Sequence, residues 1–204
     1  IENNRVIAFL QTRGYQTIFI GSGYGISQSN RQADVDIRCG LIDETIGRFI
    51  ATSLLRAPAD TLHLLENDDR RRRLCMFEAL ASLPGDAGPK FVLAHVPSPH
   101  WPFLFDAAGN PISLRNLTHD EQKRAYINQT IYLNRRVNEI IDEILEKSEV
   151  EPIIILQSDH GPAFEHGWGN PSPAFYRERL RILNAYYLPQ DGRSQAAPAG
   201  QARR

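Results

Sequence analysis

An aspartate, a histidine and a glycine follow a short apolar run in the last quarter of the chain. The run 153–156 is rich in β-branched residues and apolar on both faces, which predicts a buried strand of a parallel sheet. Asp159 and His160 come just past its carboxyl end, where open α/β sheets bind their ligands. A carboxylate oxygen beside an imidazole nitrogen suits Zn²⁺ or Mn²⁺. We therefore interpret Asp159 and His160 as metal ligands, against the alternative that Asp159 caps a turn and His160 bonds locally.

Three further histidines lie in segments that could reach the same edge of a sheet, because loops after parallel strands converge there. His100 lies in a loop with three prolines and several aromatic residues, and we interpret it as a contact to an anionic substrate. The alternative is a histidine packed against Trp101 and Phe103 in a rigid loop. His95 lies inside an apolar strand, where a satisfied core histidine is the stronger alternative to a substrate contact. His166 lies in a glycine-rich loop and is a weaker candidate for the same role.

Strand-like and helix-like patterns alternate along the chain and would position these residues. This alternation predicts an α/β fold, a doubly wound and mostly parallel sheet with helices on both faces. The tail 190–204 is polar and rich in Ala, Gly and Pro, which predicts disorder. The predicted elements are a helix from Asn3 or Asn4 to Gly14, strands at 15–20, 91–96, 153–156 and 180–188, and helices at 43–55, 69–83 and 118–146.

Two polar motifs favour ordinary structural roles. The run Arg70–Arg73 could bind phosphate, but charge runs on helices are usually solvated faces, and we expect one here. The glycine-rich segment Gly21–Gly25 lacks both the spacing of a dinucleotide-binding turn and the lysine of a P-loop, so we expect a simple turn. No Gly-x-Ser-x-Gly elbow occurs, which argues against a serine hydrolase of the α/β type.

Composition is that of a globular domain, with 204 residues, 42% hydrophobic and 23% charged. A formal net charge of -1 gives no field that would favour nucleic acid as a partner. No apolar run is long enough to span a membrane. Cys39 and Cys75 are the only cysteines, and their spacing does not decide whether they pair. Because the chain begins with Ile1 rather than Met, we expect it to be a piece of a longer protein.

Taken together, these motifs resemble the alkaline phosphatase-like superfamily, specifically its sulfatase-like and lipoteichoic-acid-synthase-like hydrolases and transferases. The resemblance runs from Asn3 to Pro189 and is most specific at the Asp-His-Gly element. It is carried by Gly14-Tyr15-Gln-Thr17, by Pro99-His100-Trp-Pro-Phe103, by Tyr126-x5-Tyr132-x-Asn134, by Ser158-Asp159-His160-Gly161 and by 181–189.

The resemblance implies metal-dependent hydrolysis or transfer of a sulfate or phosphate ester. Asp159 and His160 would bind a divalent metal (Mn, Mg, Zn or Ca), and His100 would contact the ester. The family's nucleophile lies upstream of the helix that begins here near Asn3, so no catalytic nucleophile is identifiable and we expect little turnover from the chain alone. A sulfatase Cys-x-Pro-x-Arg signature is absent.

The resemblance also implies a domain and a location. Residues 1–189 would form a fragment of a sulfatase-like catalytic domain. The parent protein would be anchored in a membrane through other segments, with this domain on the extracytoplasmic face. The alternative is a non-catalytic module of the same fold that binds an anion or a partner. A metallophosphoesterase is disfavoured because an early Asp-x-His motif is missing.

Overall fold

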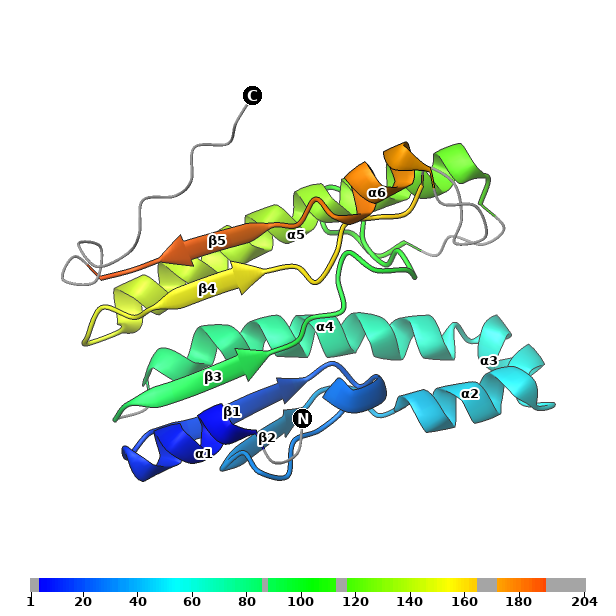
Figure 1. The fold of residues 1–204 in the computed structure, drawn as a ribbon. Coiled ribbons are helices and arrows are strands. Elements are labelled where there is room, and N and C mark those ends of the chain that lie inside the picture. The colour runs from blue at the N-terminus through cyan, green and yellow to red at the C-terminus, as the bar shows by residue number, and fades with distance from the viewer. Residues whose placement is uncertain (1–3, 86–87, 113–116, 165–171, 190–204) are drawn as a thin grey trace. The chain divides into compact units, whose positions relative to one another are not determined.

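A computed structural model describes residues 4–85, 88–112, 117–164 and 172–189. The chain divides into two compact units, Ile1–Lys147 and Ser148–Arg204, and each is described by itself. The elements of the first unit (Figure 1) are α1 (Arg5–Thr12), β1 (Gln16–Gly21), the 3-10 turn η1 (Gly25–Ser27), β2 (Val35–Arg38), α2 (Glu44–Thr52), α3 (Arg56–Thr61), α4 (Leu64–Ser82), the 3-10 turn η2 (Leu83–Gly85), β3 (Lys90–Ala94) and α5 (His119–Lys147).

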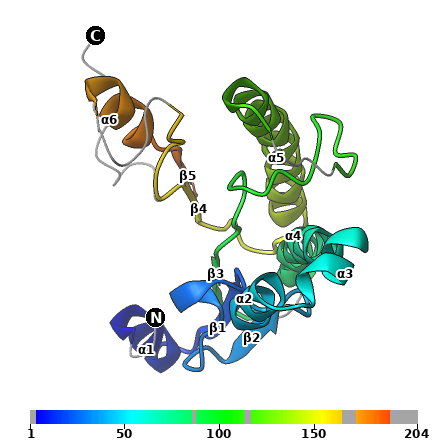
Figure 2. The same ribbon diagram turned by 90° about the vertical axis from the view of Figure 1, so that its right-hand side faces the viewer.

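The first unit contains a parallel three-stranded sheet in the order β2-β1-β3, with Ile18 of β1 opposite Val35 of β2 and Val92 of β3. Alternate residues of β1 face two different helices. Ile20 packs in a cluster with Met76 of α4, whereas Thr17 accepts a hydrogen bond from Gln11 of α1. Figure 2 shows α1 and α4 on opposite sides of the strands. The expected α/β class, with helices on both faces of a parallel sheet, is confirmed here.

Helix α5 packs against α4 and completes the core of this unit. The contact is built from Phe77 of α4, Tyr132 and Ile140 of α5, and two residues of the loop after β3, Leu104 and Phe105. All are at most 7% exposed. The loop after β3 is therefore held by the same apolar contacts that join the two helices.

The second unit contains β4 (Ile154–Gln157), α6 (Pro173–Arg179) and β5 (Asn184–Tyr187). β4 and β5 are antiparallel, with Ile154 opposite Tyr187. The expectation of a parallel strand buried on both faces is therefore wrong for β4. Alternate residues point to opposite faces, and Ile155 on one face is 60% exposed. A short apolar run does not by itself distinguish a central parallel strand from one strand of a hairpin-like pair.

Several helices begin at the capping residues that the sequence predicts. The Asn4 side chain accepts hydrogen bonds from two backbone N–H groups of α1, and the Asp43 side chain accepts one from the N–H of Ile46 in α2. Thr118 and Glu121 form the expected capping box at the start of α5. Helix α4 begins earlier than expected, after His63, and the strand β2 was not expected from the sequence.

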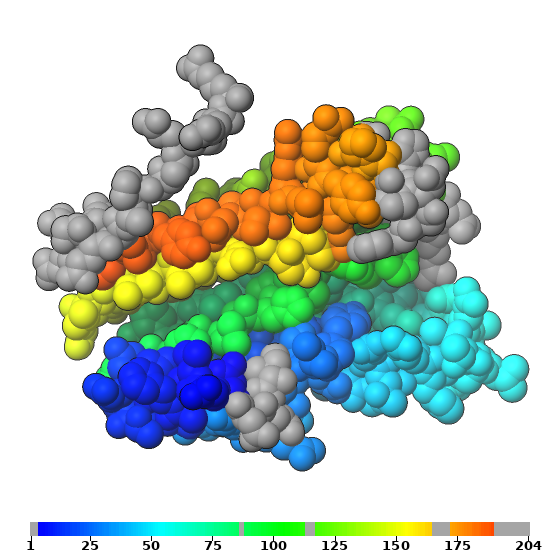
Figure 3. Space-filling view, in the orientation of Figure 1, coloured from blue at the N-terminus to red at the C-terminus, as the bar shows by residue number. Residues whose placement is uncertain are grey.

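The surface of the first unit includes the outer side of α1 (dark blue in Figure 3), where Val6 and Phe9 are each 55% exposed. Among the described residues, no helix combines the length and the apolar character needed to cross a bilayer.

Candidate active site

The loop after β3 carries His100 on its exposed part, and residues 103–105 of the same loop are buried. His100 is exposed, and its Nδ1 lies 2.6 Å from the carbonyl oxygen of Trp101. The Ser98–Pro99 and Trp101–Pro102 peptide bonds are cis. The next residue, Phe103, is 6% exposed and packs edge-on against Tyr126 of α5. The imidazole of His100 is therefore open to solvent rather than packed in the loop.

Gln129 of α5 holds the backbone of this loop from the inside. Its side chain is completely buried, and its Oε1 accepts the N–H of Leu104 at 2.6 Å and that of Phe105 at 3.3 Å. Its Nε2 lies 3.5 Å from the carbonyl oxygen of His100. One amide side chain thus satisfies two buried backbone donors and reaches the residue that carries the candidate imidazole.

We expect Gln129→Leu to lower the free energy of unfolding by about 2–4 kcal/mol, because two buried N–H groups would lose their acceptor. Urea denaturation measures the change. Gln122→Ala is the matched control, since Gln122 lies on the same helix and its Nε2 donates to the Leu117 carbonyl at 3.1 Å in a part-buried position. That control should cost less than about 1 kcal/mol. Equal losses in the two variants would contradict the assigned role of Gln129.

Two of the arginines in the run Arg70–Arg73 are buried, so the expected solvated face is wrong for them. Arg72 is 3% exposed and Arg73 is 1% exposed, whereas Arg71 is exposed. Arg73 donates from Nη2 to the carbonyl oxygen of Pro97 at 3.0 Å. This bond attaches the beginning of the His100 loop to α4.

The two buried guanidinium groups are compensated by two aspartates one turn earlier on α4. Arg72 Nη2 donates to Asp68 Oδ2 at 2.9 Å, and Arg73 Nη1 lies 3.7 Å from Asp69 Oδ1. The Tyr24 hydroxyl donates to Asp69, and burial together with that carboxylate raises the pKa of Tyr24 to about 12. The phenol therefore keeps its proton at neutral pH. Two positive and two negative groups make a structural network rather than a site for an anion.

His95 directly follows β3 and is exposed, so the alternative of a core histidine is wrong. Its backbone N–H donates to the carbonyl oxygen of Ile20 at 3.1 Å. Its Nδ1 lies 2.6 Å from Ser27 Oγ, and that oxygen lies 2.8 Å from Ser22 Oγ. The segment Gly21–Gly25 contains the turn expected there, but its serine, Ser22, belongs to a chain of hydrogen-bonded side chains that ends at the His95 imidazole.

In the second unit, Asp159 and His160 point toward each other just after β4. Asp159 Oδ2 lies 3.2 Å from His160 Nε2, and both side chains are open to solvent, with 75% and 36% exposed respectively. His160 Nδ1 lies 3.0 Å from the carbonyl oxygen of Gly161. A carbonyl can only accept, so Nδ1 carries a hydrogen. The neutral ring then has its lone pair at Nε2, whereas the protonated ring donates from Nε2 to the Asp159 carboxylate.

Gly161 fixes the backbone beside this pair. It is buried, its N–H donates to the Arg179 carbonyl at 2.8 Å, and its own carbonyl accepts from Arg179 Nη1 at 2.8 Å. A Cβ at this position would lie 2.1 Å from the carbonyl oxygen of Glu178, so only glycine lets the chain approach α6 this closely. The glycine of the motif is thus explained by packing.

The donor set of Asp159 and His160 fits two ligands of a divalent cation, a carboxylate oxygen beside a neutral imidazole nitrogen. Within the described ranges, no group of three or more His, Cys, Asp or Glu side chains could hold a metal ion. The other ligands would have to come from outside this pair. His166 lies outside the described residues. His95 and His100 belong to the first unit, and Asp159 and His160 belong to the second.

Sequence reasoning missed three residues that hold the candidate site together, Ser27, Arg73 and Gln129. A signal existed for Gln129, which lies on the same helical stripe as the buried Ala125 and Tyr132. A polar residue on an apolar stripe indicates a buried hydrogen bond. Ser27 gives no such signal, because its partner His95 is 68 residues away in sequence.

Comparisons with known proteins assign the chain to a family. The family model described as Sulfatase matches residues 2–203, almost the whole chain. No curated protein and no solved structure matches. The match agrees with the parallel sheet flanked by helices and with the Asp-His-Gly element after β4. The chain belongs to the sulfatase family, within the alkaline phosphatase-like superfamily.

Proposed function

We propose that this domain takes part in metal-dependent hydrolysis or transfer of a sulfate or phosphate ester. Membership of the sulfatase family supports ester chemistry of this kind. The observation that carries the metal-dependent part is the approach of Asp159 Oδ2 to within 3.2 Å of His160 Nε2. The second nitrogen of His160 is engaged by a backbone carbonyl, which is the arrangement that orients a metal-binding imidazole.

Each candidate residue has a separate role in this proposal. Asp159 and His160 bind the cation (Mn²⁺, Mg²⁺, Zn²⁺ or Ca²⁺), and His100, His95 and His166 contact the anionic ester. A bound cation would neutralise charge on the transferring group and lower the pKa of an oxygen nucleophile. Gln129 and Arg73 hold the backbone from which His100 projects. No described residue is assigned as the nucleophile.

The proposal places the domain on the extracytoplasmic side of a membrane. Cys39 and Cys75 form a disulfide with a Cα–Cα distance of 5.8 Å. Disulfides persist in secreted and periplasmic proteins and are rare in the reducing cytosol of mesophiles. The disulfide therefore supports a location outside the cytoplasm.

Calorimetric titration with Mn²⁺ and Zn²⁺ tests the metal site. We expect saturable binding to the unmodified chain and at least about tenfold weaker binding to Asp159→Ala, because one of two ligands is removed. Asp120→Ala is the matched control. His119 and Asp120 form another adjacent and exposed pair, with Nδ1 3.9 Å from Oδ1, at the start of α5. This variant should bind the metal as the unmodified chain does.

Two outcomes would count against the proposal. Equal weakening by Asp159→Ala and Asp120→Ala would mean that the cation binds acidic side chains without selection. No heat with either metal, together with an unchanged melting temperature, would favour the alternative function, a non-catalytic module that binds an anion or a partner. The observation behind that alternative is that no group of three or more metal-binding side chains occurs among the described residues.

A further inference from the structure

A chain of side-chain hydrogen bonds crosses the carboxyl edge of the sheet in the first unit. Strands β1 and β3 are parallel neighbours, with Ile20 opposite Ala94, so the residues that follow them emerge side by side. Ser22 follows β1, His95 follows β3, and Ser27 of η1 lies between them. The Ser22 Oγ to Ser27 Oγ distance is 2.8 Å, and the Ser27 Oγ to His95 Nδ1 distance is 2.6 Å.

The two serines are buried, and the histidine is open to solvent. Ser22 is 0% exposed and Ser27 is 8% exposed, whereas His95 is exposed. The chain of hydrogen bonds therefore runs from the protein interior to the His95 ring at the surface. One ring nitrogen, Nδ1, is bound on the inner side, which leaves Nε2 as the nitrogen available to a ligand.

The neighbouring backbone groups favour one arrangement of the hydrogens. The Tyr24 N–H donates to Ser22 Oγ at 3.1 Å, and the Tyr24 carbonyl lies 3.1 Å from Ser27 Oγ, where it can accept the Ser27 hydrogen. Ser27 Oγ is then free to accept from the hydroxyl of Ser22 and from Nδ1–H of His95. This arrangement serves both the neutral and the protonated ring, because Nδ1 carries a hydrogen in each.

We propose that Ser27, supported by Ser22, is a positioning residue that fixes His95 in the Nδ1–H form and presents Nε2 to the anionic ester. The neutral ring then offers a lone pair at Nε2, and the protonated ring offers a hydrogen at the same place, with no rotation of the ring between the two. The substrate contact of His95 rests on the proposed function, whereas the hold of Ser27 on the ring does not.

Nitrogen-15 chemical shifts of the His95 ring test the hold of Ser27 directly. With the ring neutral, we expect the unmodified chain to show the Nδ1–H form alone. Ser27→Ala should give the averaged shifts of a free imidazole, in which both tautomers exchange. Ser22→Ala should give a smaller change, because it removes only the support of Ser27. Ser27→Thr keeps the hydroxyl and should restore the unmodified shifts.

A control variant and a titration separate the two parts of the proposal. Ser82→Ala removes an exposed hydroxyl at the end of α4, which donates to the Ala79 carbonyl, and should leave the His95 shifts unchanged. Titration with inorganic sulfate should move the Nε2 resonance saturably, with several-fold weaker affinity in Ser27→Ala. Unchanged His95 shifts in a folded Ser27→Ala would overturn the positioning role. Fixed Nδ1–H shifts with no response to sulfate would refute the substrate contact alone.

Discussion

Arg72→Met is expected to lower the free energy of unfolding of the first unit by about 3–5 kcal/mol, because it removes one partner of a buried ion pair. Arg72 is 3% exposed, and its Nη2 lies 2.9 Å from Asp68 Oδ2 and also donates to the Ile42 carbonyl. The backbone N–H groups of Leu41 and Ile42 bind Asp68, but they do not neutralise its charge. Urea denaturation followed by circular dichroism measures the loss.

Arg38→Met is the matched control for burial. Arg38 of β2 pairs with Asp36 at 2.8 Å, nearly the same distance, but its side chain is 64% exposed. Solvent screens such a pair, and its loss should cost at most about 1 kcal/mol. If the two methionine variants lose the same stability, the explanation by burial is wrong. Gly23 and Gly40, both with positive φ, lie so close to the Arg72 guanidinium that a Cβ at either position would collide with it.

The sequence predicted elements whose signals are local. Asn4 and Gly14 define α1, and Thr118 with Glu121 defines the start of α5, because capping depends on residues three or four positions apart. The strand β2 was missed because Val35-Asp-Ile-Arg38 is too short and too polar to stand out. Its position in the sheet depends on pairing with β1, whose residues are not adjacent to it in sequence.

The contacts of the candidate site also divide into those that are local in sequence and those between distant residues. Asp159 and His160 are neighbours in sequence, so their proximity could be predicted, although the antiparallel pairing of β4 could not. The hold of Ser27 on His95 depends on the register of β1 against β3. The burial of Arg72 and Arg73 depends on which side of α4 faces the sheet, and a run of four arginines carries no periodicity that would reveal it.

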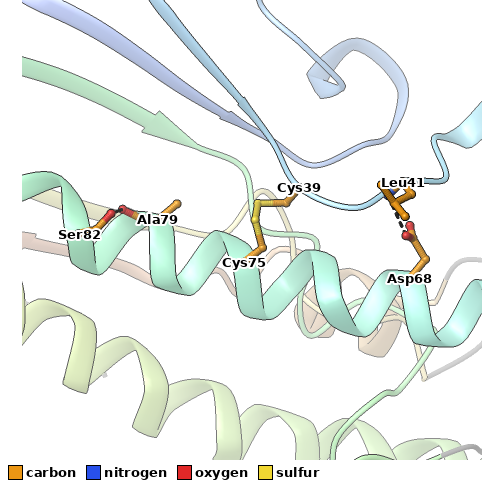
Figure 4. The surroundings of a disulfide bond; sticks show 6 residues. All are labelled: Cys39, Leu41, Asp68, Cys75, Ala79 and Ser82. Atoms are coloured by element: carbon orange, nitrogen blue, oxygen red, sulfur yellow. Dashed lines mark hydrogen bonds between the residues drawn. A yellow bond between two sulfur atoms is a disulfide. The ribbon is translucent and has the colours of Figure 1, made fainter.

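The pairing of Cys39 with Cys75 could not be predicted, because the two residues are 36 positions apart and two cysteines show no pattern. The structure brings them together because Cys39 follows β2 and Cys75 lies on the side of α4 that packs against the sheet. Figure 4 shows the disulfide between α4 and the segment after β2. Further along that segment, the Leu41 N–H donates a hydrogen bond to Asp68 of α4.

Replacing both cysteines by alanine should lower the free energy of unfolding by about 3–4 kcal/mol, because the bridge closes a loop of intermediate length and restricts the unfolded chain. Urea denaturation of the unmodified protein with and without a thiol reductant should give the same difference. The free energy of unfolding of the double variant should not change with the reductant. This variant is therefore the control for side effects of the reagent.

The position of the bridge extends this prediction to the candidate site. Cys75 is two residues from Arg73, whose guanidinium binds the carbonyl oxygen of Pro97 at the start of the His100 loop. Loss of the bridge should therefore increase hydrogen exchange in the loop 97–105 as well as in α4. Full stability and unchanged exchange after reduction would show that the packing of α4 alone holds the loop, and the disulfide would then have no part in positioning His100.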